Sequence, residues 1–261
     1  MIEKIIHFIW IDFKDELNKN TIIPKKYIDN IESCRKLNPD FEIKIWNGYD
    51  CYFFVKKYFP EYFDMYNNLK YPIQKCDIVR LMIVYIYGGI YSDVDRICIK
   101  SYNFLLDKYS KYNVILGKHK NYPNIFNDPI ICTKNNDFIY YCIKNIKIYN
   151  LGIRYFDIFL STGPFFITKQ YYTYKKKDDI IILDNELNPC NLCNCSLDIK
   201  DSITFTGYDN NWLDKNGYES IIKFIYCKLN LIFIIVLLIC FFIFLYILNK
   251  NNYFKKTKKT R

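Results

Sequence analysis

The chain has 261 residues, which is enough for one sizeable catalytic domain or two small ones. Apolar residues make up 51% and charged residues 25%, so the composition is globular and excludes an intrinsically disordered chain. The net charge of +10 does not indicate a nucleic-acid partner, because six of the positive charges lie in residues 250–261, which contain no acid. The rest of the chain carries only about +4, so we expect no nucleic-acid binding.

The N-terminal segment, residues 1–13, is expected to contain a buried strand. Its apolar run at 5–10, Ile-Ile-His-Phe-Ile-Trp, follows Glu3 and lacks the cleavage pattern of a secretory signal peptide. From there to about residue 100, strand-like and helical segments alternate, as they do in α/β proteins. We therefore expect an α/β fold, with His7 as a core residue rather than a catalyst.

Residues 73–87 are predicted to form a helix of about four turns. The run is apolar on a broad face, and Gly88 or Gly89 can take the left-handed conformation that ends a helix. Asp77 and Arg80 lie three positions apart and share one face of this helix. They could form an ordinary surface ion pair, or they could face a pocket together with the carboxylates that follow the helix.

Two of these carboxylates, Asp93 and Asp95, end the sequence Tyr-Gly-Gly-Ile-Tyr-Ser-Asp-Val-Asp at 87–95. On an extended strand, residues i and i+2 point to one face, so both carboxylates could address one cation. Mg²⁺ and Mn²⁺ favour oxygen ligands and commonly take one or two carboxylates together with substrate phosphates. The segment therefore predicts a site for a nucleotide diphosphate, although Asp-x-Asp also occurs in solvated turns.

The α/β pattern continues beyond residue 100. Residues 101–170 contain an aromatic helix, a loop with Pro123 and Pro129, and a helix near 136–148. Residues 171–220 are more polar, with a lysine- and aspartate-rich turn at 175–179.

The eleven cysteines do not identify the compartment of the protein. Six of them lie in segments expected to be core, where free cysteine behaves as a small hydrophobe: Cys34, Cys51, Cys76, Cys98, Cys132 and Cys142. The one cluster, Cys190, Cys193 and Cys195, fits a local disulfide or a tight loop. It could also be a zinc site, but no fourth ligand stands nearby at a finger-like spacing.

Residues 231–248 are eighteen consecutive apolar residues without Gly or Pro. As a helix they would span about 27 Å, close to a hydrocarbon core of ~30 Å, and a basic tail follows them. We expect a single-pass transmembrane helix at 229–249 and a tail at 250–261, after a catalytic domain at 1–222; a buried core helix is the alternative. The positive charge of the tail places the tail in the cytoplasm and the catalytic domain in a lumen. The missing N-terminal signal instead favours a cytosolic catalytic domain. The side of the membrane on which the domain lies therefore stays open. The chain is rich in Tyr, Phe, Ile, Lys and Asn, a bias that fits the AT-rich genome of a large DNA virus or a protozoan. If the source is viral, the membrane would be a host endomembrane.

Taken together, these segments resemble the DXD glycosyltransferases of family 32. That family includes fungal initiating α-mannosyltransferases and inositol-phosphoceramide mannosyltransferases, and the glucosylating clostridial toxins are similar to it in fold and motif. The resemblance is carried by Asp77-x-x-Arg80 and by the segment 87–95. It extends over roughly 210 residues through ordered matches at 5–10, Pro24, 38–46, 162–164, 180–183, Pro189 and Trp212.

The resemblance implies a GT-A-type fold, in which a mixed central sheet lies between helices and the donor nucleotide binds near the carboxyl ends of its strands. It also implies Mn²⁺ or Mg²⁺ bridging the diphosphate oxygens. Asp95 would be the direct metal ligand, and Asp93 would reach the ribose or sugar hydroxyls and a metal-bound water. Asp77 and Arg80 match residues that hydrogen-bond the donor sugar.

Five further positions match the acceptor side or the nucleotide site of the family. Thr162 and Gly163 would line the acceptor side, with Asn127 and Asp128 as additional candidates. Trp10 matches the aromatic residue that packs on the nucleoside base, although plain core packing would explain it equally well. Trp46 is expected to be core.

The C-terminal motif departs from the family pattern. The family usually closes with a His a few residues before Ser-Trp, but residues 206–212 here are Thr-Gly-Tyr-Asp-Asn-Asn-Trp. Asp209 or Asn211 could supply an oxygen ligand in place of that His, and Trp212 could still cover the diphosphate. The missing His puts the third metal ligand in doubt.

The function implied by the resemblance is metal-dependent transfer of a hexose, with retained anomeric configuration, from a nucleotide-diphosphate sugar to a glycan, lipid or protein acceptor at a membrane. Front-side attack with the leaving diphosphate as base is the implied mechanism. One alternative is a membrane-anchored pseudoenzyme or interaction protein that keeps the fold. Another is a haloacid-dehalogenase-like phosphatase, although its Asp-x-Asp motif normally continues with Thr where Ile97 stands here.

Overall fold

The computed structural model describes residues 1–118, 124–184, 186–187 and 202–206. The chain divides into two compact units, Met1–Trp212 and Leu213–Arg261, and every described residue belongs to the first. The expected membrane helix at 229–249 and the basic tail lie outside the described residues, as does the cysteine cluster at 190–195. Within the described part, no helix has the length and apolar character needed to cross a membrane. The membrane span therefore stays a prediction.

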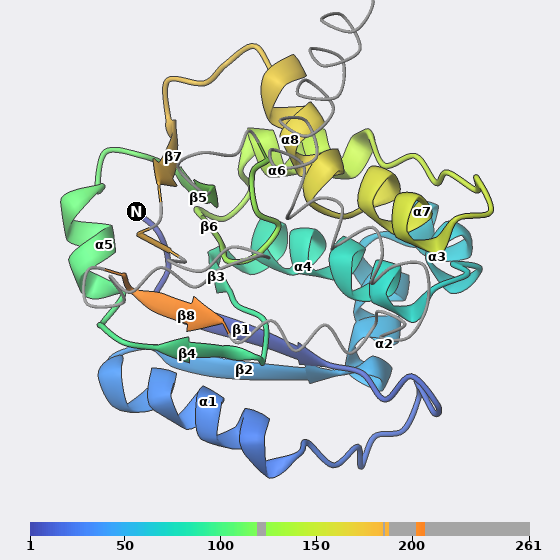
Figure 1. Ribbon diagram of the computed structural model, residues 1–261, viewed down its shortest axis with the longest axis horizontal. Coiled ribbons are helices and arrows are strands. Elements are labelled where there is room, and N and C mark those ends of the chain that lie inside the picture. The colour runs from blue at the N-terminus through green and yellow to red at the C-terminus, as the bar shows by residue number, and fades with distance from the viewer. Residues whose placement is uncertain (119–123, 185, 188–201, 207–261) are drawn as a thin grey trace, which may run out of the picture. The chain divides into compact units, whose positions relative to one another are not determined.

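The described residues form a mixed α/β domain, shown in Figure 1. The strand expected at the N-terminus and the helix expected at 73–87 are both present. In chain order the elements are β1 (Ile5–Trp10), α1 (Lys25–Leu37), β2 (Glu42–Asn47), α2 (Gly48–Tyr58), α3 (Pro60–Asn67), α4 (Pro72–Tyr87), β3 (Gly89–Tyr91), β4 (Arg96–Cys98), α5 (Asn103–Lys108), β5 (Val114–Lys118), β6 (Ile130–Cys132), α6 (Asp137–Lys144), α7 (Arg154–Ser161), α8 (Pro164–Thr173), β7 (Ile180–Asp184) and β8 (Thr204–Thr206).

The central sheet has six strands in the order β2-β1-β3-β6-β5-β7. Strand β1 runs parallel to both β2 and β3, whereas β6 is antiparallel to its neighbours β3 and β5. The carboxyl ends of β1, β2 and β3 therefore lie at the same edge of the sheet. Strands β4 and β8 form a separate antiparallel pair. Strand β4 directly follows β3 in the chain, whereas β8 is the last described strand. The mixed central sheet with flanking helices confirms the expected α/β class.

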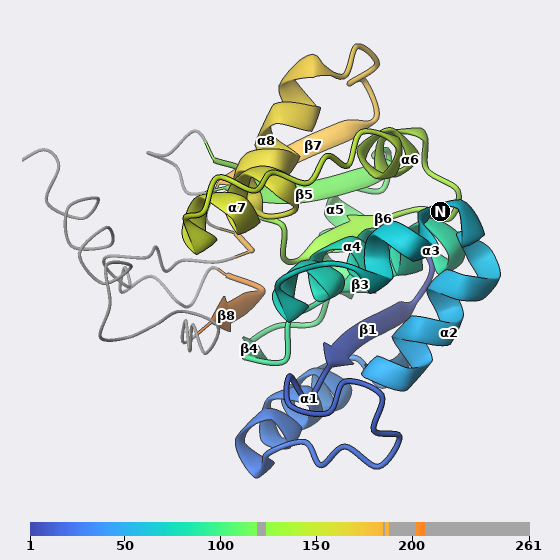
Figure 2. The same ribbon diagram turned by 90° about the vertical axis from the view of Figure 1, so that its right-hand side faces the viewer.

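The two faces of the sheet carry two separate apolar clusters, because successive residues of a strand point to opposite faces. In β5, Val114 and Leu116 belong to one cluster and Ile115 to the other. Helices α2, α3, α4, α6 and α8 contribute to the first cluster, and α1 and α5 contribute to the second. Figures 1 and 2 show α4 lying between α2 and α6. A strand that is buried on both faces, such as β5, needs apolar residues at successive positions, so its sequence is a continuous apolar run.

Helix α4 ends at two glycines that turn the chain into β3. Gly88 is the C-cap with φ 68°, and Gly89 has φ 89°, values that residues with a side chain rarely adopt. A Cβ on Gly88 would lie 1.9 Å from Glu3 Oε2, and one on Gly89 would lie 2.5 Å from the Ile5 carbonyl oxygen. The Gly-Gly pair therefore lets β3 enter the sheet directly beside β1, which brings the end of β3 close to the polar face of α4.

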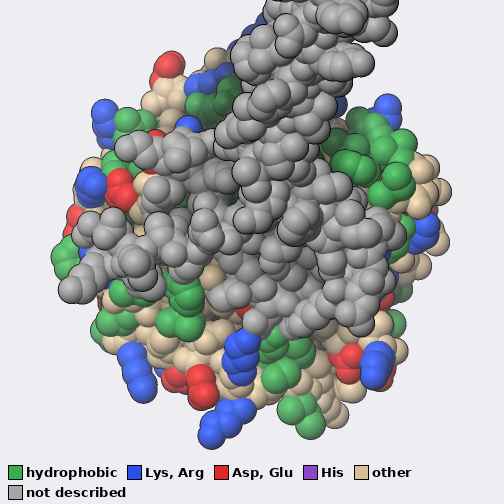
Figure 3. Space-filling view, viewed as in Figure 1, with side chains coloured by type: hydrophobic (Ala, Val, Ile, Leu, Met, Phe, Trp, Pro, Cys, Tyr) green, Lys and Arg blue, Asp and Glu red, His purple; other side chains and the backbone are tan. Residues whose placement is uncertain are grey.

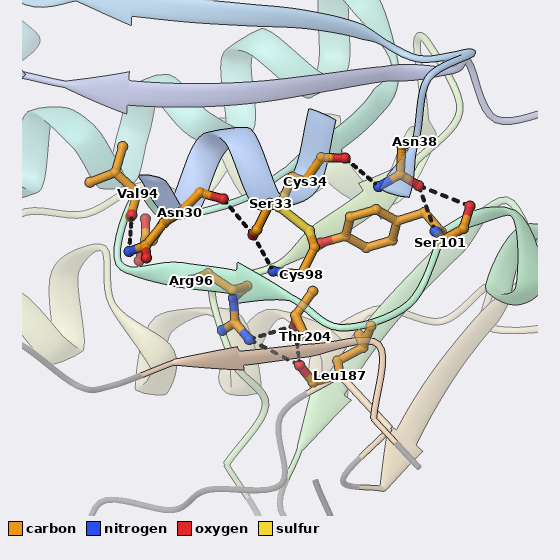
Figure 4. Close-up of a disulfide and its surroundings, with 12 residues drawn as sticks. Asn30, Ser33, Cys34, Asn38, Val94, Arg96, Cys98, Ser101, Leu187 and Thr204 are labelled. Atoms are coloured by element: carbon orange, nitrogen blue, oxygen red, sulfur yellow. Dashed lines mark hydrogen bonds between the residues drawn. A yellow bond between two sulfur atoms is a disulfide. The ribbon is translucent and has the colours of Figure 1, made fainter. Parts of the chain in front are cut away.

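A disulfide between Cys34 and Cys98 joins α1 to β4 across 64 residues of sequence. The expectation that these two cysteines are free is wrong, whereas the other four of the six are free and buried. The sequence could not pair them, since neither lies in a recognisable spacing pattern. Figure 4 shows side-chain hydrogen bonds beside the disulfide that also join α1 to the segment after β3.

Charged side chains of both signs are interspersed on the described part of the face in Figure 3. Lys and Arg do not gather into one patch there.

Candidate functional site

The segment that carries Asp93 and Asp95 is a turn between β3 and β4. Strand β3 ends at Tyr91, and the backbone N–H of Arg96 donates to the Asp93 carbonyl at 3.1 Å, which closes the turn. The expectation that both carboxylates stand on one face of an extended strand is therefore wrong, because the chain leaves the central sheet here to enter the β4–β8 pair. Asp93 and Asp95 are half-buried, so both residues are partly exposed at the surface.

The side chain of Asp93 faces helix α4. Its Oδ1 accepts a hydrogen bond from the Tyr91 hydroxyl at 2.5 Å and lies 3.4 Å from Nη2 of Arg80. The Asp93 side chain is 37% exposed, so its carboxylate contacts the buried Arg80 of α4 and also reaches the surface. Burial raises the pKa of Tyr91, which keeps its hydroxyl protonated as the donor in this contact.

Asp77 and Arg80 form a buried ion pair on α4. Nη2 of Arg80 lies 2.9 Å from Oδ1 of Asp77, and the two side chains are 3% and 4% exposed. Asp77 also accepts hydrogen bonds from Asn127 Nδ2 at 3.0 Å and from the Thr162 hydroxyl at 2.8 Å. The alternative of an ordinary surface pair is therefore wrong. Helix α4, the loop before β6 and the end of α7 meet at this carboxylate.

Arg80 connects this cluster to the turn. Its Nη1 donates to the Asn127 carbonyl oxygen at 2.9 Å, and its guanidinium lies 4.6 Å from the centre of the Tyr91 ring. Burial alone would lower the pKa of Arg80, but the carboxylates of Asp93 and Asp77 raise it well above its ordinary value. Arg80 therefore stays charged between two carboxylates, one buried and one half-exposed.

Asp77 has a strongly shifted pKa. Burial raises it from the ordinary 3.8 to about 6, while Arg80 and the Thr162 hydrogen bond oppose the rise and Asp93 adds to it. A carboxylate with a pKa near 6 changes its charge close to neutral pH, which is common at functional sites.

A second buried pair, Asp128 and Arg96, lies beneath the same turn. Oδ2 of Asp128 accepts from Nε of Arg96 at 2.9 Å and from Nη2 at 2.6 Å, while Oδ1 accepts from the backbone N–H of Asp93 at 2.7 Å. Asp128 was expected on the acceptor side, and no observation tests that role. Sequence reasoning missed Arg96; the one signal in the sequence was its position directly after the Asp-x-Asp motif.

The other residues predicted from the sequence surround this cluster or lie apart from it. Trp10 ends β1, with its ring 5.1 Å from that of Tyr27, and its buried Nε1 has no hydrogen-bond partner among the described residues. Thr162 lies at the C-cap of α7 and Gly163 at the N-cap of α8. Asp209, Asn211 and Trp212 lie outside the described residues.

His7 is a core residue, as expected. Trp46 Nε1 donates to its Nδ1 at 3.3 Å, so Nε2 carries the proton and donates to the Gly88 carbonyl at 3.0 Å. Burial lowers the pKa of His7 to about 4, so the imidazole is neutral at physiological pH.

Among the described residues, the candidate metal ligands are the carboxylates of Asp93 and Asp95. The residues that the structure describes contain no cluster of three or more His, Cys, Asp or Glu able to hold a metal ion. Two half-buried carboxylates fit a hard cation such as Mg²⁺ or Mn²⁺, which takes few protein ligands when phosphate oxygens complete its shell.

A family model described as "Glycosyltransferase sugar-binding region containing DXD motif" matches residues 24–112. This range includes α4 with Asp77 and Arg80, and the turn with Asp93 and Asp95. The matched region therefore contains Asp77, Arg80 and the DXD turn, whereas Asn127 and Thr162 lie beyond it.

Several curated proteins are similar to this chain. An uncharacterized glycosyltransferase of Acanthamoeba polyphaga mimivirus is 31% identical over 205 residues, which are 74% of this chain and 76% of that protein. Inositol phosphoceramide mannosyltransferase 1 of Schizosaccharomyces pombe is 32% identical over 178 residues, which are 66% of this chain and 52% of the relative. The chain spans about half the length of the inositol phosphoceramide mannosyltransferases that it matches.

A solved structure has a similar fold. The PaToxG glycosyltransferase superposes with a TM-score of 0.50 and 23% identity, over 66% of this chain and 69% of that one. At this level of identity the likeness shows a shared fold, in agreement with the expected GT-A-type arrangement.

Proposed function

This chain belongs to the family of glycosyltransferases whose sugar-binding region contains a DXD motif, and on that premise we propose that it transfers a hexose from a nucleotide-diphosphate sugar with retention of the anomeric configuration. The observation that carries the proposal is the buried cluster of Asp77, Arg80, Asn127 and Thr162, which opens toward the half-exposed Asp93. The phosphatase alternative is wrong, because the chain is a glycosyltransferase.

The cluster has the chemistry that a donor sugar needs. A buried carboxylate–guanidinium pair loses its hydration on folding, and the loss is offset only if other groups complete its hydrogen bonds. Sugar hydroxyls can donate to Asp77 and Asp93 and accept from Arg80. We propose that these three side chains bind the sugar and orient its anomeric carbon toward the acceptor side, with Thr162 and Gly163 at that side. Orientation of this kind supplies much of the rate of a transfer reaction.

Asp93 and Asp95 would hold Mn²⁺ or Mg²⁺, with Asp95 as the direct ligand and Asp209 or Asn211 as further oxygen ligands. The ion would neutralise the charge that develops on the leaving diphosphate. Trp10 would pack against the nucleoside base, and Trp212 would cover the diphosphate. The unpartnered Nε1 of Trp10 supports this, because a buried indole N–H normally has an acceptor and a bound nucleotide could provide one.

Mannose is the first sugar to test, because several relatives are named as inositol phosphoceramide mannosyltransferases. Their names also make a lipid headgroup the first acceptor to test, before glycans and proteins. A lipid acceptor would agree with the expected single-pass membrane helix at 229–249, whose orientation and compartment stay open.

The test is a donor screen with the purified full-length chain. UDP- and GDP-sugars are incubated with Mn²⁺, and release of free nucleotide is followed with and without a phosphoinositol lipid; Asp93→Ala/Asp95→Ala is the control. We expect turnover of one donor, and its loss by about 10²–10³-fold or more in the control. Nucleotide binding without turnover of any donor would favour the pseudoenzyme alternative. Turnover that persists in the control would contradict the assignment of the DXD carboxylates.

A further inference from the structure

Arg96 and Asp128 form a buried pair that touches the DXD turn but has no side chain open to solvent. Arg96 is 2% exposed and Asp128 is 8% exposed. We infer that the two are positioning residues: they hold the turn so that Asp93 and Asp95 face the donor, and they do not contact the donor themselves. The inference rests on the proposed function for its kinetic consequence, but its structural part stands on the contacts of the turn.

Every N–H group of Arg96 has an acceptor within the protein. Nε and one N–H of Nη2 donate to Oδ2 of Asp128, and the other N–H of Nη2 donates to the Asp128 carbonyl at 2.9 Å. Nη1 donates to the Leu187 carbonyl and to the Thr204 hydroxyl, both at 2.9 Å. A guanidinium has five N–H donors, so none is left for a ligand. The side chain joins the end of the turn to the loop before β6 and to β8.

Asp128 holds the other end of the turn. Its Oδ1 accepts the backbone N–H of Asp93 at 2.7 Å, while Arg96 is the residue whose own N–H closes the turn on the Asp93 carbonyl. One ion pair therefore fixes both the first and the last residue of the four-residue turn.

Helix α1 fixes the middle of the turn from the opposite side. Asn30 Nδ2 donates to the carbonyl oxygen of Val94, the residue between the two carboxylates, at 3.0 Å. Asp93 and Val94, which precede Asp95, and Arg96, which follows it, are all held by hydrogen bonds. The backbone of Asp95 therefore has little freedom. Figure 4 shows Asn30 and Val94 on one side of β4 and Arg96 with Leu187 and Thr204 on the other.

The pair also sets the charge beneath the turn. Arg96 places a positive charge against the Asp128 carboxylate, which in turn accepts the backbone N–H of Asp93. Lysine would keep the positive charge but could not make the planar fork that Arg96 makes to Asp128. Arg96→Lys therefore separates the geometric role of the pair from its charge.

The test compares Arg96→Lys and Asp128→Asn with the wild-type full-length chain. In Asp128→Asn the new NH₂ group cannot accept from Arg96, so the turn should lose one of its attachments with little change of shape. Hydrogen exchange is followed by mass spectrometry in peptides covering residues 89–98, with β1 and β5 as internal references. Nucleotide release is measured in parallel with the donor found by the screen, separating kcat from KM. Cys142→Ala is the matched control, because this cysteine is fully buried and lies in α6 rather than in the turn.

We expect exchange in residues 89–98 to accelerate about tenfold or more in both variants, with β1 and β5 unchanged and kcat lowered about 10–100-fold. Cys142→Ala should lower the unfolding midpoint without a selective change at the turn. Exchange that rises equally in all peptides, or unchanged exchange at the turn, would overturn the inference. If Arg96→Lys does not fold, Asp128→Asn decides alone. A wild-type chain that turns over no donor would contradict the proposed function, while exchange at the turn would still decide the positioning role.

Discussion

Two buried arginine–aspartate pairs meet at Asp93, and they differ in what completes their hydrogen bonds. Arg80 lies between the buried Asp77 and the Asp93 carboxylate, which is 37% exposed, so this pair opens toward the surface. Arg96 gives all its N–H groups to protein acceptors, so its pair with Asp128 is closed. We therefore propose that the same two residue types bind a ligand in one place and hold a turn in the other. The decisive difference is the exposure of the third partner.

The largest expected effect is on the closed pair. Arg96→Ala should lower the free energy of unfolding by about 3–5 kcal/mol, because it leaves the Asp128 carboxylate buried without its partner. Chemical denaturation of the full-length variant measures this. Arg35→Ala is the control, since Arg35 and Glu32 form an ion pair with side chains 49% and 43% exposed and should contribute less than about 1 kcal/mol. Equal effects in the two variants would remove the distinction between a closed and an exposed pair.

The second largest expected effect is on the disulfide between Cys34 and Cys98, which joins α1 to β4. Cys34→Ser/Cys98→Ser should lower the free energy of unfolding by about 2–4 kcal/mol, because the bond closes a loop of 64 residues in the unfolded chain. The same measurement with and without a reducing agent should give this difference only in the wild-type protein. A wild-type stability that does not respond to the reductant would contradict the pairing of these two cysteines.

The open pair should respond in activity rather than in stability. Asp77→Asn is expected to lower kcat/KM by about 10²-fold, since the amide keeps the shape of the side chain but not its charge toward Arg80 and the sugar. Its free energy of unfolding should change by less than that of Arg96→Ala. A variant that is strongly destabilised yet retains wild-type kcat/KM would reverse the roles assigned to the two pairs.

The open pair should also give a pH dependence. Burial raises the pKa of Asp77 to about 6, and a protonated carboxyl accepts fewer hydrogen bonds from Asn127, Thr162 and the donor sugar. The value of kcat/KM should therefore fall about tenfold per pH unit below pH ~6. Asp77→Asn should lose this acidic limb. An unchanged limb in that variant would assign the titration to another group.

The same shift has a stability consequence of opposite sign to that of most carboxylates. The pKa of Asp77 is higher in the folded protein than in the unfolded chain, so folding favours the protonated form. Its contribution to stability is present below pH ~4 and is lost as the pH rises through about 6. Relative to Asp77→Asn, the wild-type protein should lose up to about 3 kcal/mol between these values. A difference that grows with pH would contradict the direction of the pKa shift.

The open pair could be predicted from the sequence because its interactions are local. An i,i+3 spacing on a helix places Asp77 and Arg80 on one face, and a Gly-Gly break fixes where that helix ends. Structure was needed to show that this face is buried against Asn127 and Thr162. Whether a face is buried depends on distant segments, which helical spacing does not reveal.

The closed pair and the disulfide could not be predicted for the same reason. Arg96 and Asp128 are 32 residues apart, and Cys34 and Cys98 are 64 apart, so only the tertiary fold brings them together. The DXD segment was misread as a strand because its alternating residues fit one. The turn is set by Asp128 and Asn30, two contacts that local sequence does not encode.

The central claim, that the open pair binds the donor sugar, is tested most directly by calorimetric titration of Asp77→Asn. The full-length variant and the wild-type chain are titrated with the active sugar nucleotide and with the matching free nucleotide, both with Mn²⁺. We predict that the variant binds the sugar nucleotide at least about tenfold more weakly and the free nucleotide with wild-type affinity. An equal loss of affinity for both ligands would contradict the claim.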